Sequence, residues 1–175
     1  MQRTGPARFT LALVAKEAGL SPATLVQRFG SKRKLLQALS ASGTGFGHYF
    51  VAQLRTQHNS PLQVAREFLL CFAEMASTPA EMANHLAWLQ MDLTDPVMHR
   101  NFLDLSQDNL AILSGLLGEA VTAGELKPND SMALARVLSA LTTGGLLAWA
   151  TFREGTARAW LEQDIDLVLR PYLRS

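Results

Sequence analysis

The sequence contains one cysteine, few charged residues and no long uninterrupted apolar run. Cys71 has no second cysteine to pair with, so nothing requires an oxidising compartment. The N-terminus lacks the apolar stretch of a signal peptide, so export is not indicated. The longest uncharged apolar stretch, 137–152, contains polar residues and glycines and is short for a bilayer span of roughly 20 residues. We therefore expect a cytoplasmic protein that does not insert into a membrane.

Motifs that carry enzymatic or metal chemistry are also missing from the sequence. It contains no P-loop, no G-x-S-x-G, no G-x-G-x-x-G and no C-x-x-C. The pairs Glu81/His85 and Asp95/His99 have the i, i+4 spacing of helical metal ligands. No second ligand pair of the di-iron or zinc-protease type accompanies them, so ordinary polar or pocket roles are expected. We predict that the chain is not an enzyme and holds no metal and no cofactor.

The charges are distributed unevenly along the chain. Residues 1–40 hold one acidic residue, Glu17, against seven basic ones: Arg3, Arg8, Lys16, Arg28, Lys32, Arg33 and Lys34. The remainder holds nine basic and fourteen acidic residues. A basic end joined to a mildly acidic body suits a protein that places one end against phosphates.

Helix-start signals occur throughout the chain. A good N-cap residue stands directly before proline four times, and proline at the first helical position loses no hydrogen bond. These starts are Ser21, Ser60, Thr78 and Asp95, and helical periodicity after Thr10, Ser31, Asp130 and Thr156 adds four more. No sustained alternation or hairpin signal is present. The sequence predicts an all-α protein of about eight helices.

The apolar patterns indicate how these helices pack. The segment from Pro61 has one stripe, and the segment 96–123 has two, which is typical of a central helix. The segments 131–153 and 156–170 are more apolar than one small core can cover, which indicates a partner subunit; interior helices of a monomer are the alternative. Gly144 and Gly145 each cost roughly 1 kcal/mol relative to alanine within a helix, so close packing is expected there.

Three glycines mark the junction between the basic region and the body. Gly43, Gly45 and Gly47 follow the helix that starts near Ser31, and they indicate either a hinge or a plain helix end and loop. We divide the chain here into a basic N-terminal module, residues 1–42, and a helical body, residues 43–175.

The segment 10–39 has the pattern of a helix-turn-helix. A first helix from Thr10 ends at Gly19, which tolerates a positive φ, and Ser21 caps a second helix. We expect the apolar side chains of the first helix and turn to face inward: Leu11, Val14, Ala15, Ala18 and Leu20.

The second helix presents two faces. Leu25 and Phe29 are spaced to anchor it, which leaves Thr24, Gln27 and Arg28 on the opposite face, where they can enter a major groove. Arg28 could donate to guanine and Gln27 could bond adenine, whereas Thr24 suits a phosphate or a thymine methyl group.

Phosphate contacts are expected at the helix starts. Backbone N–H groups at the starts near Thr10 and Ser31, with Lys32 and Lys34, can hold phosphates. The predicted DNA-contacting set is Thr10, Ser21, Thr24, Gln27, Arg28, Lys32 and Lys34.

This segment resembles the TetR-family helix-turn-helix, T-x-x-x-I-A-x-x-A-G-V-S-x-G-T-L-Y-x-H/Y-F-x-S-K-x-x-L. The matching residues are Thr10, Val14, Ala15, Ala18, Gly19, Leu20, Ser21, Thr24, Leu25, Phe29, Ser31, Lys32 and Leu35. The resemblance implies a homodimer built through the last two helices, a ligand cavity inside the body, and binding to a palindromic operator in double-stranded DNA.

Two positions depart from the family pattern. Val26 stands where the family has a tyrosine that contacts the DNA backbone, so operator preference does not carry over. We expect the helix that precedes this motif in the family to be missing here, since only nine residues precede Thr10 and they include Gly5 and Pro6. Either the chain starts downstream of the natural start, or the module is a truncated variant with weakened DNA binding in which Phe9, Leu13 and Phe29 lose a packing partner.

Aromatic and sulfur-containing side chains of the body are candidates for lining an apolar cavity, although any one such side chain is more often plain core. They are Phe68, Phe72, Met75, Trp88, Met91, Phe102 and Trp149, with His85, Gln90 or Asn109 as polar anchors. Our hypothesis is a repressor released by a small, largely apolar ligand. The alternative is a small-molecule-binding helical dimer with impaired or lost DNA binding.

Overall fold

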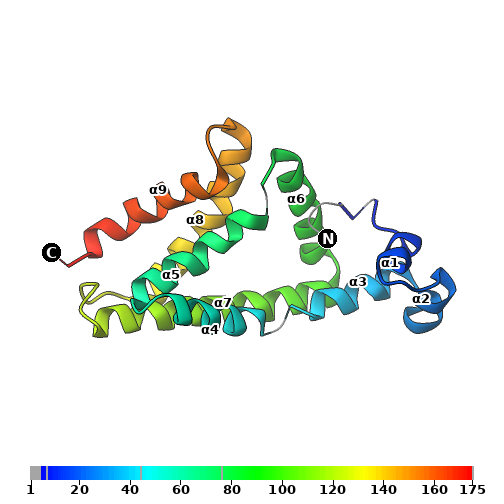
Figure 1. Ribbon diagram of the computed structural model, residues 1–175, viewed down its shortest axis with the longest axis horizontal. Helices are drawn as coiled ribbons and strands as arrows, with labels where there is room; N and C mark the ends of the chain where they lie inside the picture. Colours follow the sequence, from blue (N-terminus) through cyan, green and yellow to red (C-terminus); the bar gives the residue numbers. More distant parts are fainter. Residues whose placement is uncertain (1–4, 7, 44, 76, 175) are drawn as a thin grey trace.

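The computed structural model describes residues 5–6, 8–43, 45–75 and 77–174, so Arg3 of the basic region lies outside it. The described residues form helices and no strand, which confirms the all-α prediction (Figure 1). The α-helices are α1 (Leu11–Glu17), α2 (Pro22–Phe29), α3 (Lys32–Ala41), α4 (Phe46–Gln57), α5 (Pro61–Leu70), α6 (Pro79–Thr94), α7 (Pro96–Thr122), α8 (Ser131–Phe152) and α9 (Ala157–Leu169). Two short 3₁₀ helices are Cys71–Met75 and Arg170–Tyr172.

All eight predicted helix starts are confirmed. At each, the side chain of the predicted cap accepts a hydrogen bond from a backbone N–H in the first turn. The helix that the sequence did not reveal is α4, which follows Gly45 at φ 81° without a side-chain cap. α3 ends at Ala41 and α4 begins at Phe46, so Gly43 and Gly45 lie between the two helices and Gly47 lies inside α4.

The long helix α7 is central to the body, as predicted. It packs against α3, α4, α5, α6 and α8, and its buried face belongs to the largest core of the described chain. Figure 1 shows α7 running beneath α5, α6 and α8, with α1 and α2 at one end of the molecule and α9 at the other. This arrangement places the basic module far from the C-terminal helix pair.

The two glycines of α8 have different surroundings. A Cβ on Gly145 would lie 2.7 Å from Cδ2 of Leu161, so this glycine allows α8 to approach α9 closely. Gly144 faces solvent, and none of the described atoms would meet a Cβ there within 4 Å. Close packing therefore explains Gly145 within the protomer and does not explain Gly144.

The outer face of α8 and α9 is apolar. Val137 is 53% exposed, Phe152 64% and Leu167 61%. Among the described helices α8 alone is long and apolar enough to cross a membrane, and 33% of its most apolar window is buried. Length and composition of this kind also occur in helices packed inside a protein, so they do not by themselves indicate a membrane span.

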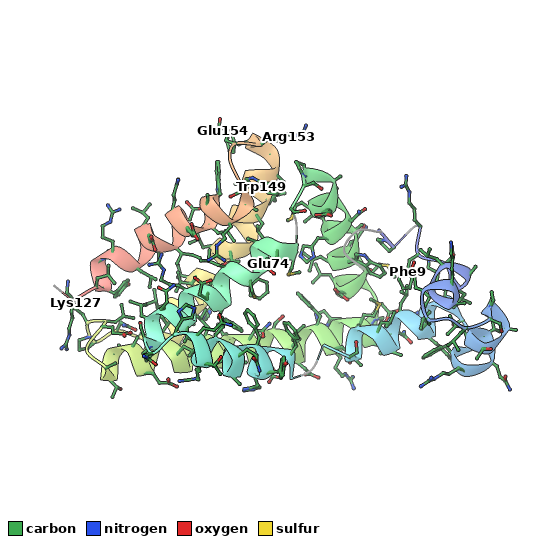
Figure 2. The ribbon with its side chains drawn as sticks, in the orientation of Figure 1. Phe9, Glu74, Lys127, Trp149, Arg153 and Glu154 are labelled. Atoms are coloured by element: carbon green, nitrogen blue, oxygen red, sulfur yellow. The ribbon has the colours of Figure 1, made fainter. Side chains whose placement is uncertain are left out.

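A second hydrophobic cluster joins the N-terminal module to the body. Its buried members are Phe9, Leu35, Leu36, Trp88 and Met98, from the module, α6 and α7. Phe9 and Trp88 meet edge to face with ring centroids 5.4 Å apart, and Figure 2 shows Phe9 between the module and α6. The expectation that Phe9 lacks a packing partner is therefore wrong, because α6 supplies one.

The inward-facing side of α1 is smaller than predicted. Ala15 is buried, whereas Leu11 and Val14 are half-buried. Ala18 and Leu20, which we expected to face inward, are exposed, as is Leu13. The prediction is wrong for Ala18 and Leu20 because no described element packs on that side of α1 and the turn.

Candidate nucleic-acid interface and ligand cavity

The turn between α1 and α2 has the geometry of a helix-turn-helix corner. Gly19 has φ 64°, a region that favours glycine, and the following Leu20 N–H donates to the Ala15 carbonyl. The Ser21 hydroxyl then accepts from the Thr24 N–H and starts α2. The chain therefore makes a tight turn over the few residues between the two helices.

Helix α2 is anchored on one face and open on the other. Leu25 is buried and Phe29 is half-buried, whereas Thr24, Gln27 and Arg28 are exposed. The Arg28 guanidinium lies 5.5 Å from the centre of the Phe29 ring. The three side chains assigned to base reading thus share an accessible face of a helix held by its other face.

The residues assigned to phosphate binding are not equally free. Thr10 and Ser21 are exposed N-caps, and Lys34 is also exposed. Lys32 is half-buried, and its ammonium group donates to the Pro6 carbonyl at 2.8 Å. Lys32 is therefore committed to the segment before α1, and Lys34 is the more accessible of the two lysines.

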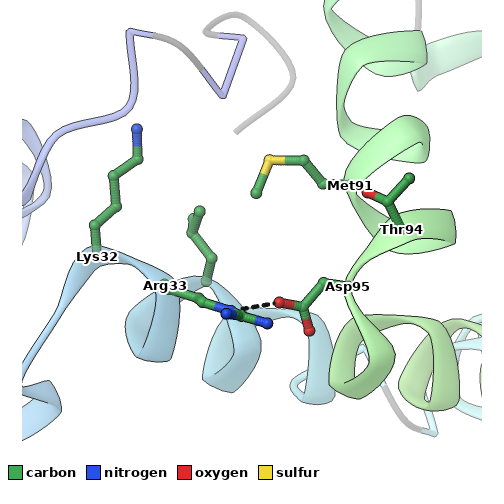
Figure 3. Close-up of a pocket in the computed structure, with 6 residues that line it drawn as sticks. Lys32, Arg33, Met91, Thr94 and Asp95 are labelled. Carbon is green, nitrogen blue, oxygen red and sulfur yellow. Dashed lines mark hydrogen bonds and ion pairs between the residues drawn. The ribbon is translucent and has the colours of Figure 1, made fainter.

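A group of polar contacts that the sequence did not reveal connects α3 to the start of α7. Arg33 Nε donates to Asp95 Oδ2 at 2.7 Å (Figure 3). Gln37 Nε2 donates to Asp95 Oδ1 at 3.0 Å. The same carboxylate accepts from the Val97 and Met98 N–H groups and so caps α7. The sequence identifies Asp95 only as a helix cap and as a member of the Asp95/His99 pair; in the structure it also binds α3 of the N-terminal module.

The hydrogen bonds around Asp95 control its pKa. Burial alone would raise the pKa, but bonds from Gln37, from the Met98 N–H, from Arg33 and from the Val97 N–H lower it to about 2. The carboxylate is therefore ionised at neutral pH.

A cavity of about 440 Å³ lies between α5, α6, α7 and α8. Four of the predicted ligand residues line it, namely Phe68, Phe72, His85 and Phe102. The other lining residues are Leu69, Leu89, Asp92, Leu93, Leu105, Ser106, Asn109, Ser139, Thr142 and Thr143. Of the proposed polar anchors His85 and Asn109 lie in the lining, whereas Gln90 is exposed on α6 and outside it.

The remaining predicted ligand residues lie elsewhere. Trp88 lines a smaller space of about 180 Å³ beside α3, and Met91 lines an open cleft between α3 and α6. Met75 lies in the 3₁₀ helix after α5 and is outside the 440 Å³ lining. Trp149 is buried in the core, where its indole N–H donates to the Gly155 carbonyl at 3.3 Å.

Gly47 allows α4 to close one side of the body core. A Cβ there would lie 2.8 Å from Asn109 Oδ1 and 2.9 Å from Ile112 Cδ1. The sequence marked this glycine only as part of a helix interruption, because a close approach between helices leaves no local signal.

The described residues offer little for catalysis or metal binding. They contain no group of three His, Cys, Asp or Glu placed to hold a metal ion. Burial, with a smaller effect from Glu74, raises the pKa of Cys71 to about 12, so its thiol is a poor nucleophile at neutral pH.

Residues 1–39 match the family model described as "Bacterial regulatory proteins, tetR family". No curated protein matches the chain. Similar solved structures include the ketosteroid transcriptional regulator KstR2 of Mycobacterium tuberculosis, with TM-score 0.64, 16% identity, and coverage of 99% of this chain and 89% of that one. A transcriptional regulator from Cytophaga hutchinsonii has TM-score 0.66, 17% identity, and coverage of 99% and 92%. FadR of Thermus thermophilus, a TetR-family repressor solved with lauroyl-CoA, has TM-score 0.60, 23% identity, and coverage of 97% and 87%.

The predicted resemblance is therefore confirmed, in sequence over residues 1–39 and in fold over nearly the whole chain. The matched family model indicates DNA-binding transcriptional regulation as the general function, and the solved structures show the fold.

Proposed function

Because residues 1–39 match the TetR-family model and the chain has the fold of such regulators, we propose that it represses transcription by binding operator DNA and is released by a ligand. The observation that carries the proposal is the exposed face of α2. Thr24, Gln27 and Arg28 point away from the module while Leu25 and Phe29 hold the helix in place. A helix anchored in this way can enter a major groove without rearrangement.

Each residue of this surface has a distinct proposed role. Arg28 donates to guanine and Gln27 bonds adenine, while Thr24 contacts a phosphate or a thymine methyl group. Phosphates are held at the capped helix starts of Thr10 and Ser21, and by Lys34. Lys32 shares this role only if its bond to Pro6 is exchanged for a phosphate.

We also propose that two copies associate through α8 and α9. The exposed apolar side chains of this face, including Val137, Leu147 and Leu167, would be covered by the same face of a second copy. A dimer with two-fold symmetry would place two α2 helices on successive major grooves, which requires a palindromic operator. Light scattering tests this directly: Leu147→Glu should turn dimers into monomers, and a wild-type monomer at micromolar concentration contradicts the dimer.

The proposed ligand acts from the cavity in the body. Asp92, Phe102 and Leu105 line the cavity and also the smaller space that borders Leu36 and Ser40 of α3. A ligand that moves these three residues changes the surface against which α3 packs. It would favour a conformation in which the two α2 helices no longer match the operator, and a differential affinity of a few kcal/mol is enough for this shift.

The proposed division of the chain places the DNA-reading module in residues 1–42 and the ligand-binding and dimerisation domain in residues 43–175. The two parts share the cluster around Leu36 and Trp88, so we expect them to act as one coupled unit. A regulator of this kind works in the cytoplasm.

A gel shift on the promoter region of the chain's own gene tests DNA reading. Arg28→Ala should weaken specific binding by roughly 1–3 kcal/mol if Arg28 reads a base. Arg170→Ala is the matched control, because Arg170 is exposed and directly follows α9. Figure 1 shows α9 at the opposite end of the molecule from α2. Equal affinities of the two variants would remove Arg28 from the reading surface.

The second candidate is a small-molecule-binding helical dimer with impaired or lost DNA binding. The exposed Leu13 and Leu20 on the module favour it, because apolar side chains without packing partners stabilise a module little. If the protein binds a ligand but gives no gel shift with any candidate operator at low salt, this second candidate is favoured over the DNA-binding repressor.

A further inference from the structure

The cavity between α5, α6, α7 and α8 contains one formally charged side chain, the carboxylate of Asp92. The other described lining residues are apolar, hydroxyl or amide side chains, together with His85. Burial lowers the pKa of His85, so this imidazole is neutral at pH 7. Neither lysine nor arginine occurs among the lining residues that the structure describes.

Three of the four hydroxyl groups in the lining, those of Ser106, Thr142 and Thr143, already donate to backbone carbonyls. Thr142 donates to the Leu138 carbonyl, Thr143 to the Ser139 carbonyl and Ser106 to the Phe102 carbonyl. Within the described chain, no residue forms a hydrogen bond or ion pair with the Asp92 carboxylate. Asp92 is therefore available to a ligand, whereas these hydroxyls bond their own helices.

The position of Asp92 is unfavourable for a carboxylate without a partner. It stands in the last turn of α6, where the unpaired backbone carbonyls give the helix end a negative potential. It is half-buried, and burial raises its pKa, so no residue that the structure describes compensates the charge of its ionised form. A positive charge beside Asp92 would gain from both the carboxylate and the helix end.

We propose that the cavity selects an apolar organic cation: an amine whose ammonium group pairs with Asp92 and whose apolar part contacts Phe68, Phe72 and Phe102. The inference rests on the proposed ligand-binding function and narrows it to one chemical class. The aromatic side chains suit the apolar part of the amine, and the rings of Phe68 and Phe72 already meet edge to face with their centroids 6.2 Å apart. An anionic ligand finds a like charge and no basic side chain.

The position of Asp92 also explains how binding of a cation in the cavity could affect the DNA-reading module. Asp92 borders both the ligand cavity and the space beside Leu36 and Ser40 of α3. Pairing with an ammonium group draws the Asp92 carboxylate toward the cavity and changes the surface against which α3 packs.

Calorimetric titration of the full chain at pH 7 with three ligands of equal chain length tests the head-group preference. The probes are decylammonium, decanol and decanoate, each below its micelle concentration. Wild type should bind decylammonium about tenfold more tightly than decanol, and decanoate least tightly, as expected for one charge-assisted hydrogen bond. Asp92→Asn should lose this advantage of decylammonium over decanol and leave decanol affinity unchanged.

The control is Asp104→Asn, which removes an exposed carboxylate of α7 outside the cavity lining. It should leave all three affinities unchanged, which separates pairing at Asp92 from general attraction to an acidic surface. If Asp92→Asn does not fold, the wild-type ranking of the three probes decides the matter by itself.

Three results would overturn the proposal: decanoate binding as tightly as decylammonium, an unchanged decylammonium affinity in Asp92→Asn, or no binding of any probe. Calorimetry needs no DNA, so it is independent of the gel shift. If the protein prefers decylammonium but gives no gel shift with any operator, the cation proposal stands and regulation through DNA is rejected. If it gives a gel shift with its operator but prefers decanoate, regulation through DNA stands and the cation proposal is rejected.

Discussion

Truncation of Leu36 should loosen the contact between the DNA-reading module and the body. Leu36 lies on α3, is 2% exposed and belongs to the cluster that includes Phe9 and Trp88. It also lines both the open cleft and the smaller space between α3 and the helices α6 and α7. We expect Leu36→Ala to lower stability and, separately, to weaken DNA binding.

The magnitude follows from the surroundings of Leu36. Leucine-to-alanine changes in cores cost about 2–5 kcal/mol, and the cost grows with the cavity that remains. Leu36 borders an open cleft of about 540 Å³, so water and neighbouring side chains can enter the vacated space. We therefore expect a loss of about 2–3 kcal/mol, near the lower end of that range.

Leu116→Ala is the matched control. Leu116 is also 2% exposed but lies in the main core on α7, outside the three cavities named above. Its truncation leaves an enclosed void, so a loss of about 3–5 kcal/mol is expected. Leu116→Ala should therefore cause the larger loss of stability, and Leu36→Ala the larger loss of DNA affinity.

Urea denaturation followed by tryptophan fluorescence, at one fixed protein concentration, measures both stabilities, and a gel shift measures DNA affinity. Leu36→Ala should reduce affinity by about tenfold or more, because a loosened α3 no longer holds the α2 helices at the operator spacing. The reasoning is refuted if Leu36→Ala costs under about 1 kcal/mol. It is also refuted if both variants bind DNA like the wild type.

Three further changes test local features. Ser21→Ala removes the cap of α2 and should lower the free energy of unfolding by about 1 kcal/mol and weaken the gel shift. Asp95 has a folded pKa of about 2, below its ordinary 3.8, so its contribution to stability is complete above pH 4 and is lost as the pH falls toward 2. Asp95→Asn keeps a capping side chain and should flatten the pH dependence of thermal unfolding in that window. Gly145→Ala places a Cβ 2.7 Å from Leu161 Cδ2, and overpacking of about 1–3 kcal/mol should exceed the roughly 1 kcal/mol gained in helix propensity.

Each of these has a contrary outcome. Ser21→Thr should retain the cap, so equal losses in Ser21→Thr and Ser21→Ala would contradict the capping argument. An unchanged slope between pH 4 and pH 2 in Asp95→Asn would exclude Asp95 as a source of acid sensitivity. A Gly145→Ala protein more stable than wild type in denaturation would show that α8 and α9 are not in close contact at Leu161.

The sequence by itself determined where most helices begin, because helix starts depend on local chemistry. A capping oxygen and a proline act within one turn, so the four cap-proline pairs and the four further caps could be read without any tertiary contact. The spacing of Leu25 and Phe29 likewise decided which face of α2 is open. Helix α4 escaped notice because Gly45 starts it without a capping side chain.

Only the tertiary structure decided which helices meet. The contacts of Phe9 with Trp88 and of Arg33 with Asp95 join residues far apart in the chain, and periodicity shows that a face is buried without showing what covers it. The cavity that contains Asp92 exists because four helices leave space between them, and Gly47 matters because Asn109 lies against it. These features depend on how the helices pack, and no local pattern of residues specifies that packing.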